Sequence, residues 1–157
     1  MSSVERGARV RFPPPLIFLL CVSAGVGLRY GPAPIHAPVD STVRLATGLA
    51  VQLLGVALVV SARILFRRTR QSPLPWTPSP VLLLEGPYRF TRNPMYVGVT
   101  LFQLGLGVTL DNVWISMLAV PALVAVHFIA VLPEERYLSE KFGEPYDRYL
   151  AQVRRYL

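Results

Sequence analysis

Residues 86–98 read GPYRFTRNPMYVG and fix the architecture, because a polar, aromatic and arginine-bearing run here meets an apolar one. Asn93 and Pro94 indicate a helix start. Asparagine can cap free backbone N–H groups, and proline fits the first helical turn, where its missing N–H is not needed. The residues that follow, to about Leu110, are apolar enough to enter a membrane. The stretch therefore predicts a helix whose N-terminus lies at a membrane surface.

Two arginines, Arg89 and Arg92, stand beside this predicted helix N-terminus. Because a helix N-terminus carries a partial positive charge, the arrangement suits a carboxylate or a phosphate. The same residues are typical of an interfacial loop, in which arginines mark the inner face of the membrane and tyrosines anchor at its surface. The sequence alone leaves both interpretations open.

The composition is that of an integral membrane protein: 52% of the 157 residues are hydrophobic, 16% are charged, and the mean hydropathy is +0.43. The net charge of +7 comes from basic residues between apolar runs. This pattern favours an anionic inner leaflet over nucleic acid as the partner. Cys21 is the single cysteine, which excludes a disulfide framework, and His36 and His127 are far apart, so no metal site is predicted.

Four apolar runs, each predicted to be a helix, lie at about 16–30, 43–66, 94–110 and 113–132. We expect an all-α fold with about four transmembrane helices, a single domain over residues 1–157, and a C-terminal helical segment at the cytoplasmic interface. The first run follows a basic, proline-broken start and also resembles a signal peptide. Because no clear cleavage site precedes a soluble domain, we favour a retained first span.

The distribution of arginines predicts the orientation in the membrane. Six arginines and one glutamate lie within residues 63–92. By the positive-inside rule this segment faces the cytoplasm, and four spans would place both termini there as well. We therefore expect a multi-pass protein surrounded by bilayer lipid.

Several polar residues inside the runs have two interpretations. One face of the third run is polar or small at helical spacing: Tyr96, Thr100, Gln103 and Gly107. Such a face either packs against another helix or lines a ligand groove. Gln52 is expected to hydrogen-bond between helices rather than to contact a substrate. His127 is either a functional group within a span or a neutral histidine bonded to a neighbouring helix.

The chain after the fourth run is predicted to form two short helices, one ending at Phe142 before Gly143 and one beginning at Pro145. The second helix carries Tyr146 and Tyr149 on one face, so it should lie along the membrane surface. A tight turn between the third and fourth runs brings their inner ends side by side, where the second helix would cap them.

Two motifs in a fixed order carry a family resemblance. The first is the stretch at 86–98; the second reads EERYLSEKFGEPYDRY at 134–149 and follows after one helical hairpin. Together they resemble the membrane methyltransferases related to isoprenylcysteine carboxyl methyltransferase and to phospholipid N-methyltransferases. The resemblance covers residues 84–155. It implies a cytoplasm-facing pocket for S-adenosylmethionine, closed by the C-terminal segment, with a lipid substrate entering from the bilayer.

By position, the resemblance implies eight cofactor-binding residues on two facing walls: Tyr88, Arg92, Asn93, Pro94, Tyr96 and Gly98, and opposite them Glu134 and Glu135. Gly105 and Gly107 are similar to a glycine pair proposed as a cofactor contact in the phospholipid branch. The isoprenylcysteine branch has histidine at the position of Asn93, so a role for an imidazole does not transfer. No catalytic residue is assigned.

The residue chemistry fits this cofactor independently. Arg92 and the helix N-terminus suit its carboxylate, the glutamates suit its ammonium, and tyrosine faces suit its sulfonium or adenine. We therefore predict S-adenosylmethionine-dependent methylation, on O, N or S, of a membrane-embedded lipid or other hydrophobic small molecule. The alternatives are a non-catalytic membrane scaffold that kept the fold, and an NADPH-dependent enzyme like the sterol reductases, which resemble this family in their C-terminal pocket. The acceptor and the oligomeric state stay open.

Overall fold

The computed structural model describes residues 7, 8, 10, 12–31 and 39–156. Every regular element in these residues is helical, which confirms the all-α prediction. The elements are α1 (Pro14–Tyr30), α2 (Ser41–Arg68), the 3-10 turn η2 (Gly86–Arg89), α3 (Pro94–Thr109), α4 (Val113–Met117), α5 (Ala119–Val126), the π-helical turn η3 (His127–Val131), α6 (Leu132–Phe142) and α7 (Glu144–Gln152). His36 and the arginines of the basic start, Arg6, Arg9 and Arg11, lie outside the described residues.

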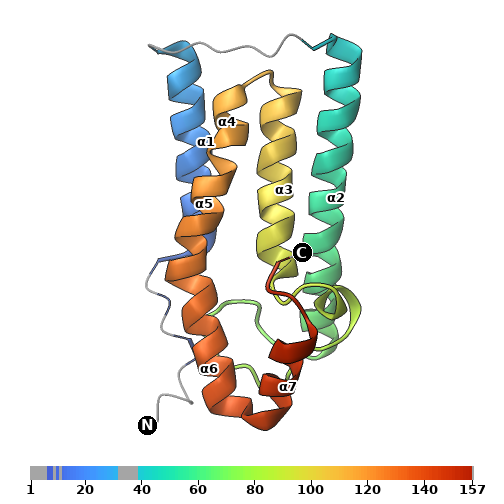
Figure 1. Ribbon diagram of the computed structural model, residues 1–157, viewed down its shortest axis with the longest axis vertical. Helices are drawn as coiled ribbons and strands as arrows, with labels where there is room; N and C mark the ends of the chain where they lie inside the picture. Colours follow the sequence, from blue (N-terminus) through green and yellow to red (C-terminus); the bar gives the residue numbers. More distant parts are fainter. Residues whose placement is uncertain (1–6, 9, 11, 32–38, 157) are drawn as a thin grey trace.

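Helices α1, α2, α3 and the α4–α5 pair run side by side in an elongated bundle (Figure 1). The most extensive helix–helix contact in the described residues joins α2 to α3. A Cβ atom added to Gly98 would lie 2.7 Å from the carbonyl oxygen of Gly55, and one added to Gly105 would lie 2.6 Å from that of Gly48. Gly98 and Gly105 are seven residues apart on α3, and Gly48 and Gly55 are seven residues apart on α2, so each helix presents its two glycines on one face. Small residues on facing helices allow the close packing that apolar helices need in a membrane.

The predicted fourth span consists of α4, α5, η3 and α6, which follow one another along the chain. It was expected to end at Leu132, but the helix continues to Phe142. Its two irregularities each precede a proline. Leu118 interrupts the α-helix before Pro121, and the π turn lies before Pro133. Proline donates no N–H to the carbonyl four residues earlier, so regular hydrogen bonding fails at these places.

By length and composition, two helical stretches of the described chain could cross a membrane: Ser41–Arg68 and Val113–Phe142. Only 11% of the apolar window in α2 is buried inside the protein, so most of this helix faces outward. Helices α1 and α3 are apolar but shorter, with 17 and 16 residues. The expectation of four spans therefore stays a prediction.

The polar face of α3 packs against its neighbours over most of its length. Gln103 Nε2 donates to the backbone carbonyl of Ile115, 3.1 Å away, and the backbone at Gly107 lies against Ser116. On the other side, Gln52 Nε2 donates to Thr109 Oγ1 over 2.6 Å. Packing is therefore the correct interpretation for this part of the face, and the interhelical role of Gln52 is confirmed.

Arginines fix the C-terminal end of α3, away from the motifs. Arg44 donates to the carbonyl of Thr109 and Arg29 to that of Asp111, each over 2.5 Å. Cations at the carbonyl end of a helix offset its dipole. With this end anchored, the N-terminus of α3 and Arg92 before it lie at the opposite end of the bundle.

Helix α6 leaves the bundle at that opposite end, and the chain then turns back on itself (Figure 1). The turn is made by Gly143, whose φ of 59° lies in the left-handed region that favours glycine. Helix α7 returns toward the bundle, so that the backbone N–H of Arg92 donates to the carbonyl of Arg154 over 3.0 Å. The predicted break at Gly143 is confirmed.

Candidate functional site

Asn93 occupies the N-cap position of α3, but its side chain makes no capping bond to the described backbone. Its Nδ2 instead donates to the carbonyl oxygen of Arg155, 3.0 Å away, and Thr91 Oγ1 donates to the same oxygen over 3.1 Å. The predicted capping role of Asn93 is therefore wrong: its side-chain oxygen accepts no bond from the described backbone of α3, and its amide nitrogen instead binds the carbonyl of Arg155. We refer to Val153–Tyr156 as the terminal strap.

Three charged side chains meet where the terminal strap passes α6. Arg155 grips Glu135 with two donors, its Nε lying 3.0 Å from Oε1 and its Nη2 2.8 Å from Oε2. Arg92 Nη1 lies 3.5 Å from Glu135 Oε1, and both of these side chains are 12% exposed. The buried Nε of Arg92 has no hydrogen-bond partner among the described residues. Glu135 is thus balanced by two arginines, and Arg92 is the more loosely held of the two.

Glu134 has a different environment from its neighbour Glu135. The hydroxyl of Tyr96 donates to its Oε1. Burial raises the pKa of Glu134 to about 7; the hydrogen bond from Tyr96 opposes this shift, and the charge of Glu135 adds to it. Glu134 lies beyond the apolar run that ends at Leu132. The contact joins the first turns of α3 and α6, which confirms the prediction that the two motifs meet.

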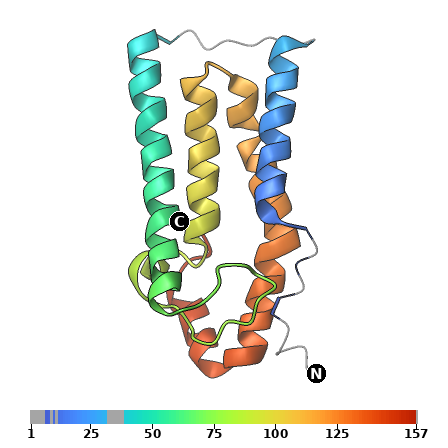
Figure 2. The ribbon, with the colours of Figure 1, turned by 180° about the vertical axis from the view of Figure 1, so that it is seen from behind.

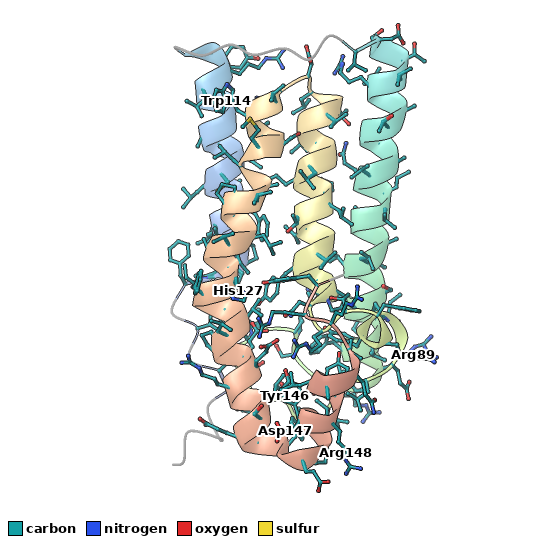
Figure 3. The ribbon with its side chains drawn as sticks, in the orientation of Figure 1. Arg89, Trp114, His127, Tyr146, Asp147 and Arg148 are labelled. Atoms are coloured by element: carbon teal, nitrogen blue, oxygen red, sulfur yellow. The ribbon has the colours of Figure 1, made fainter. Side chains whose placement is uncertain are left out.

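Two tyrosines of α7 cover this site. The hydroxyl of Tyr149 donates to the carbonyl of Tyr88 over 2.8 Å, and Tyr146 is 2% exposed. Burial raises the pKa of Tyr88, Tyr146 and Tyr149, so these hydroxyls stay protonated. Figure 3 shows Tyr146 between α6 and α7, whereas Arg148 points away from them. The tail helix thus caps the motifs as predicted.

One pocket of about 430 Å³ joins these groups, a size typical of ligand sites. Its polar part is lined by Tyr88, Arg92, Asn93, Tyr96, Glu134, Glu135, Tyr146 and Tyr149. Most of the remaining lining is apolar, and we call it the apolar part: Pro13–Pro15, Phe66, residues 73–76, residues 81–83, Met95 and Leu138. Five polar residues also border it: Arg63, Gln71, Ser72, Ser79 and Tyr137.

Six of the eight predicted cofactor residues line the polar part. The other two, Pro94 and Gly98, do not belong to the lining: Pro94 is buried at the start of α3, and Gly98 faces α2. Sequence reasoning missed Pro13–Pro15 and the contact of Arg155 with Glu135. The sequence holds two signals for the apolar part. The four prolines of residues 71–80 predict an irregular segment at the interface, and the short apolar run 81–84, which cannot span a membrane, is expected to dip into the interface or cover a site.

His127 lies outside the lining of the pocket but holds the terminal strap. Its Nδ1 is 2.9 Å from the hydroxyl of Tyr156, and Figure 3 shows His127 on the long helix above α6. Of the two interpretations, the structure supports a bonded histidine, with a partner on the strap instead of a neighbouring helix. The residue begins the π turn, and such turns are frequent at functional sites.

Comparison with known proteins assigns this architecture to a family. The sequence pattern of the phospholipid methyltransferases matches residues 43–145, from α2 into α7. The chain belongs to the phospholipid methyltransferase family. This membership confirms the resemblance drawn from the two motifs, and the matched region includes all of the polar part except Tyr146 and Tyr149.

Two curated relatives lie in the isoprenylcysteine branch. Over 73 residues the chain is 32% identical to the protein-S-isoprenylcysteine O-methyltransferase of Schizosaccharomyces pombe, and 37% identical to protein-S-isoprenylcysteine O-methyltransferase B of Arabidopsis thaliana. Each match covers 46% of this chain, but only 31% and 36% of the relatives. The chain thus matches about a third of their length. Pro13–Pro15 and Arg155 lie outside residues 43–145, which match the family pattern.

Proposed function

We propose that this protein transfers a methyl group from S-adenosylmethionine to an acceptor whose apolar portion stays in the membrane. One observation carries the proposal: a single pocket places Arg92, Glu134 and four tyrosines beside an apolar part. A charged nucleoside cofactor and an apolar acceptor need these two kinds of surface next to each other. The match to a methyltransferase family supports the same conclusion.

The polar part fits the charged groups of this cofactor. The guanidinium of Arg92, which lines the pocket, suits the carboxylate, because a guanidinium binds carboxylates strongly. Glu134 suits the ammonium, since Glu135 is already balanced by Arg92 and Arg155. Tyrosine rings suit the sulfonium by cation–π attraction. When bound, the cofactor supplies an electrophilic methyl group.

The residues of the chain contribute alignment and the exclusion of water. Tyr96 fixes the carboxylate of Glu134, and Tyr149 ties α7 to the backbone at Tyr88. With Tyr146 buried beneath α7, this side of the pocket is shielded from solvent. Holding two reactants in line in a dry site accounts for a large part of the rate enhancement in such transfers.

The test begins with binding. Calorimetric titration of the purified protein with S-adenosylhomocysteine should show saturable binding, and changing both Glu134 and Glu135 to Gln should lower the affinity at least about tenfold, since a charge-assisted hydrogen bond contributes about 1.5–3 kcal/mol. Lipid extracts from cells with and without the gene, compared by mass spectrometry, should differ by one methyl group in the acceptor. Absence of binding by the unaltered protein contradicts the proposal.

We also propose that four helices cross the membrane with the pocket at the cytoplasmic face. The arginines of residues 63–92 support this orientation. Cysteines placed at Ser72 and Ser139 should resist an impermeant thiol reagent in intact cells, whereas one placed at the exposed Thr42, at the other end of the bundle, should react. Labelling of Ser72→Cys or Ser139→Cys from outside would show that the orientation is the reverse of the one proposed.

A further inference from the structure

The terminal strap is fixed at each of its last three described residues. The carbonyl of Arg154 accepts from the backbone of Arg92, and the hydroxyl of Tyr156 meets His127. The carbonyl of Arg155 between them accepts from both Thr91 and Asn93. These contacts set the backbone of Arg155 against the first motif, independently of its own side chain.

The side chain of Arg155 then decides which partners Glu135 takes. Its two donors occupy both carboxylate oxygens at 2.8–3.2 Å. Arg92 approaches the same carboxylate through Nη1 alone, at 3.5 Å, and its Nε stays without a partner among the described residues. Without Arg155, Glu135 could turn to take two donors of Arg92, because paired guanidinium–carboxylate bonds are the favoured geometry.

We propose that Arg155 is a positioning residue: by holding Glu135, it keeps a donor of Arg92 available for the carboxylate of the bound cofactor. The inference rests on the proposed function, since it concerns the amino-acid end of S-adenosylmethionine. Arg155 itself lies beyond the residues matched by the family pattern, which end at 145. It acts through Glu135 and Arg92, and it does not line the pocket.

Two arginine variants and two ligands test this assignment. Arg155→Ala removes the grip on Glu135, while Arg154→Ala removes the same charge from a neighbouring residue that is exposed. S-adenosylhomocysteine carries the amino-acid carboxylate, and 5′-methylthioadenosine lacks it. Calorimetry in detergent should show that Arg155→Ala lowers the affinity for S-adenosylhomocysteine at least about tenfold. The affinity of this variant for 5′-methylthioadenosine should stay within about twofold, and Arg154→Ala should change neither.

Two further variants separate positioning from a structural role. Arg155→Lys should recover part of the affinity, because lysine keeps the charge but not the two-pronged geometry. Adding Arg155→Ala to Glu135→Gln should cause little further loss, since residues that act through one another are not additive. Equal weakening of both ligands in Arg155→Ala, or unchanged binding of S-adenosylhomocysteine, would overturn the assignment. If the unaltered protein binds neither ligand, the proposed function fails and this inference fails with it.

Discussion

The polar and apolar parts of the pocket are built in different ways. Side chains from distant segments join across the polar part, as Tyr96 does with Glu134 and Arg155 with Glu135. The apolar part depends on residues 71–83, which cross from the lower end of α2 toward α1 and α6 in the view from behind (Figure 2). This segment is held by scattered hydrogen bonds from its backbone, such as that from Ser79 N to the side-chain hydroxyl of Tyr137 over 3.1 Å.

The difference matches the two ligands that we propose for the pocket. A charged ligand needs donors and acceptors aimed at fixed atoms, whereas an apolar chain needs only surface removed from water. The apolar part is also partly open, since Leu74, Trp76 and Val81 are 45%, 40% and 51% exposed. An acceptor could therefore enter along this side while the cofactor is held at the other.

Removal of the tail should have the largest effect on the polar part. Truncation after Gly143 removes α7 and the terminal strap, and with them Tyr146, Tyr149 and Arg155. Because these residues cover and order the polar part, we expect no detectable binding of S-adenosylhomocysteine by calorimetry. The bundle contacts among α1–α5 do not involve the tail, so the truncated protein should still insert in membranes. Undiminished affinity in detergent would make the tail an anchor only.

A bulky residue in the apolar part should weaken binding of the acceptor and leave binding of the cofactor unchanged. Leu83 lines the pocket, whereas its neighbour Leu84 is 41% exposed and lies outside the lining. Leu83→Trp should raise the KM for the acceptor about tenfold, equivalent to about 1.4 kcal/mol of lost binding, with unchanged affinity for S-adenosylhomocysteine. Leu84→Trp is the matched control. Equal KM values in the two variants would show that the acceptor binds elsewhere.

The polar part could largely be predicted from the sequence, because two ordered motifs carry it and their family resemblance implies which of their residues face the cofactor. Arg92, Asn93 and Tyr96 are fixed relative to a helix start, and Glu134 follows the run that pairs with that helix. The helices themselves were also predictable: α3 was expected at 94–110 and is found at Pro94–Thr109. Pro121, which interrupts the fourth run, was not recognised as a break.

The apolar part could not be predicted, because apolar contact requires area and not spacing. Pro13–Pro15 carry no motif. The apolar run 81–84 was expected to dip into the interface or cover a site, but its meeting with Pro13–Pro15 depends on how residues 71–83 fold over the start of α1. Arg155 was missed for a similar reason. It is one arginine among several in a basic tail, and nothing in its spacing indicates that it would reach Glu135.

The pKa of Glu134 gives the polar part a pH dependence. The folded protein binds this proton more tightly than the unfolded chain, since the pKa rises from 4.5 to about 7. The associated stability is complete below about pH 4.5 and is lost as the pH rises through about 7. Glu134→Gln should flatten this profile and stabilise the protein above pH 7 by about 1–3 kcal/mol.

Binding should respond to the same titration in the opposite direction. If the carboxylate meets the cofactor's ammonium, affinity for S-adenosylhomocysteine should fall several-fold between about pH 8 and pH 6, and the fall should be absent in Glu134→Gln. The exposed Glu140 on the same helix provides the control as Glu140→Gln. A pH-independent affinity in the unaltered protein would remove Glu134 from this role.

The smallest effect on binding is expected at Gly98, which belongs to the first motif but faces away from the pocket. An added Cβ would lie 2.7 Å from the backbone oxygen of Gly55, and backbone cannot yield as a flexible side chain would. Gly98→Ala should therefore lower the free energy of unfolding by about 1–3 kcal/mol, with little change in affinity for S-adenosylhomocysteine. The control is Gly27→Ala in α1, where an added Cβ would meet no other part of the described chain within 4 Å and alanine should stabilise the helix by up to about 1 kcal/mol. Weaker binding in Gly98→Ala at unchanged stability would instead place this glycine in the cofactor wall, as the motif implies, and the polar part would then extend behind the first turn of α3.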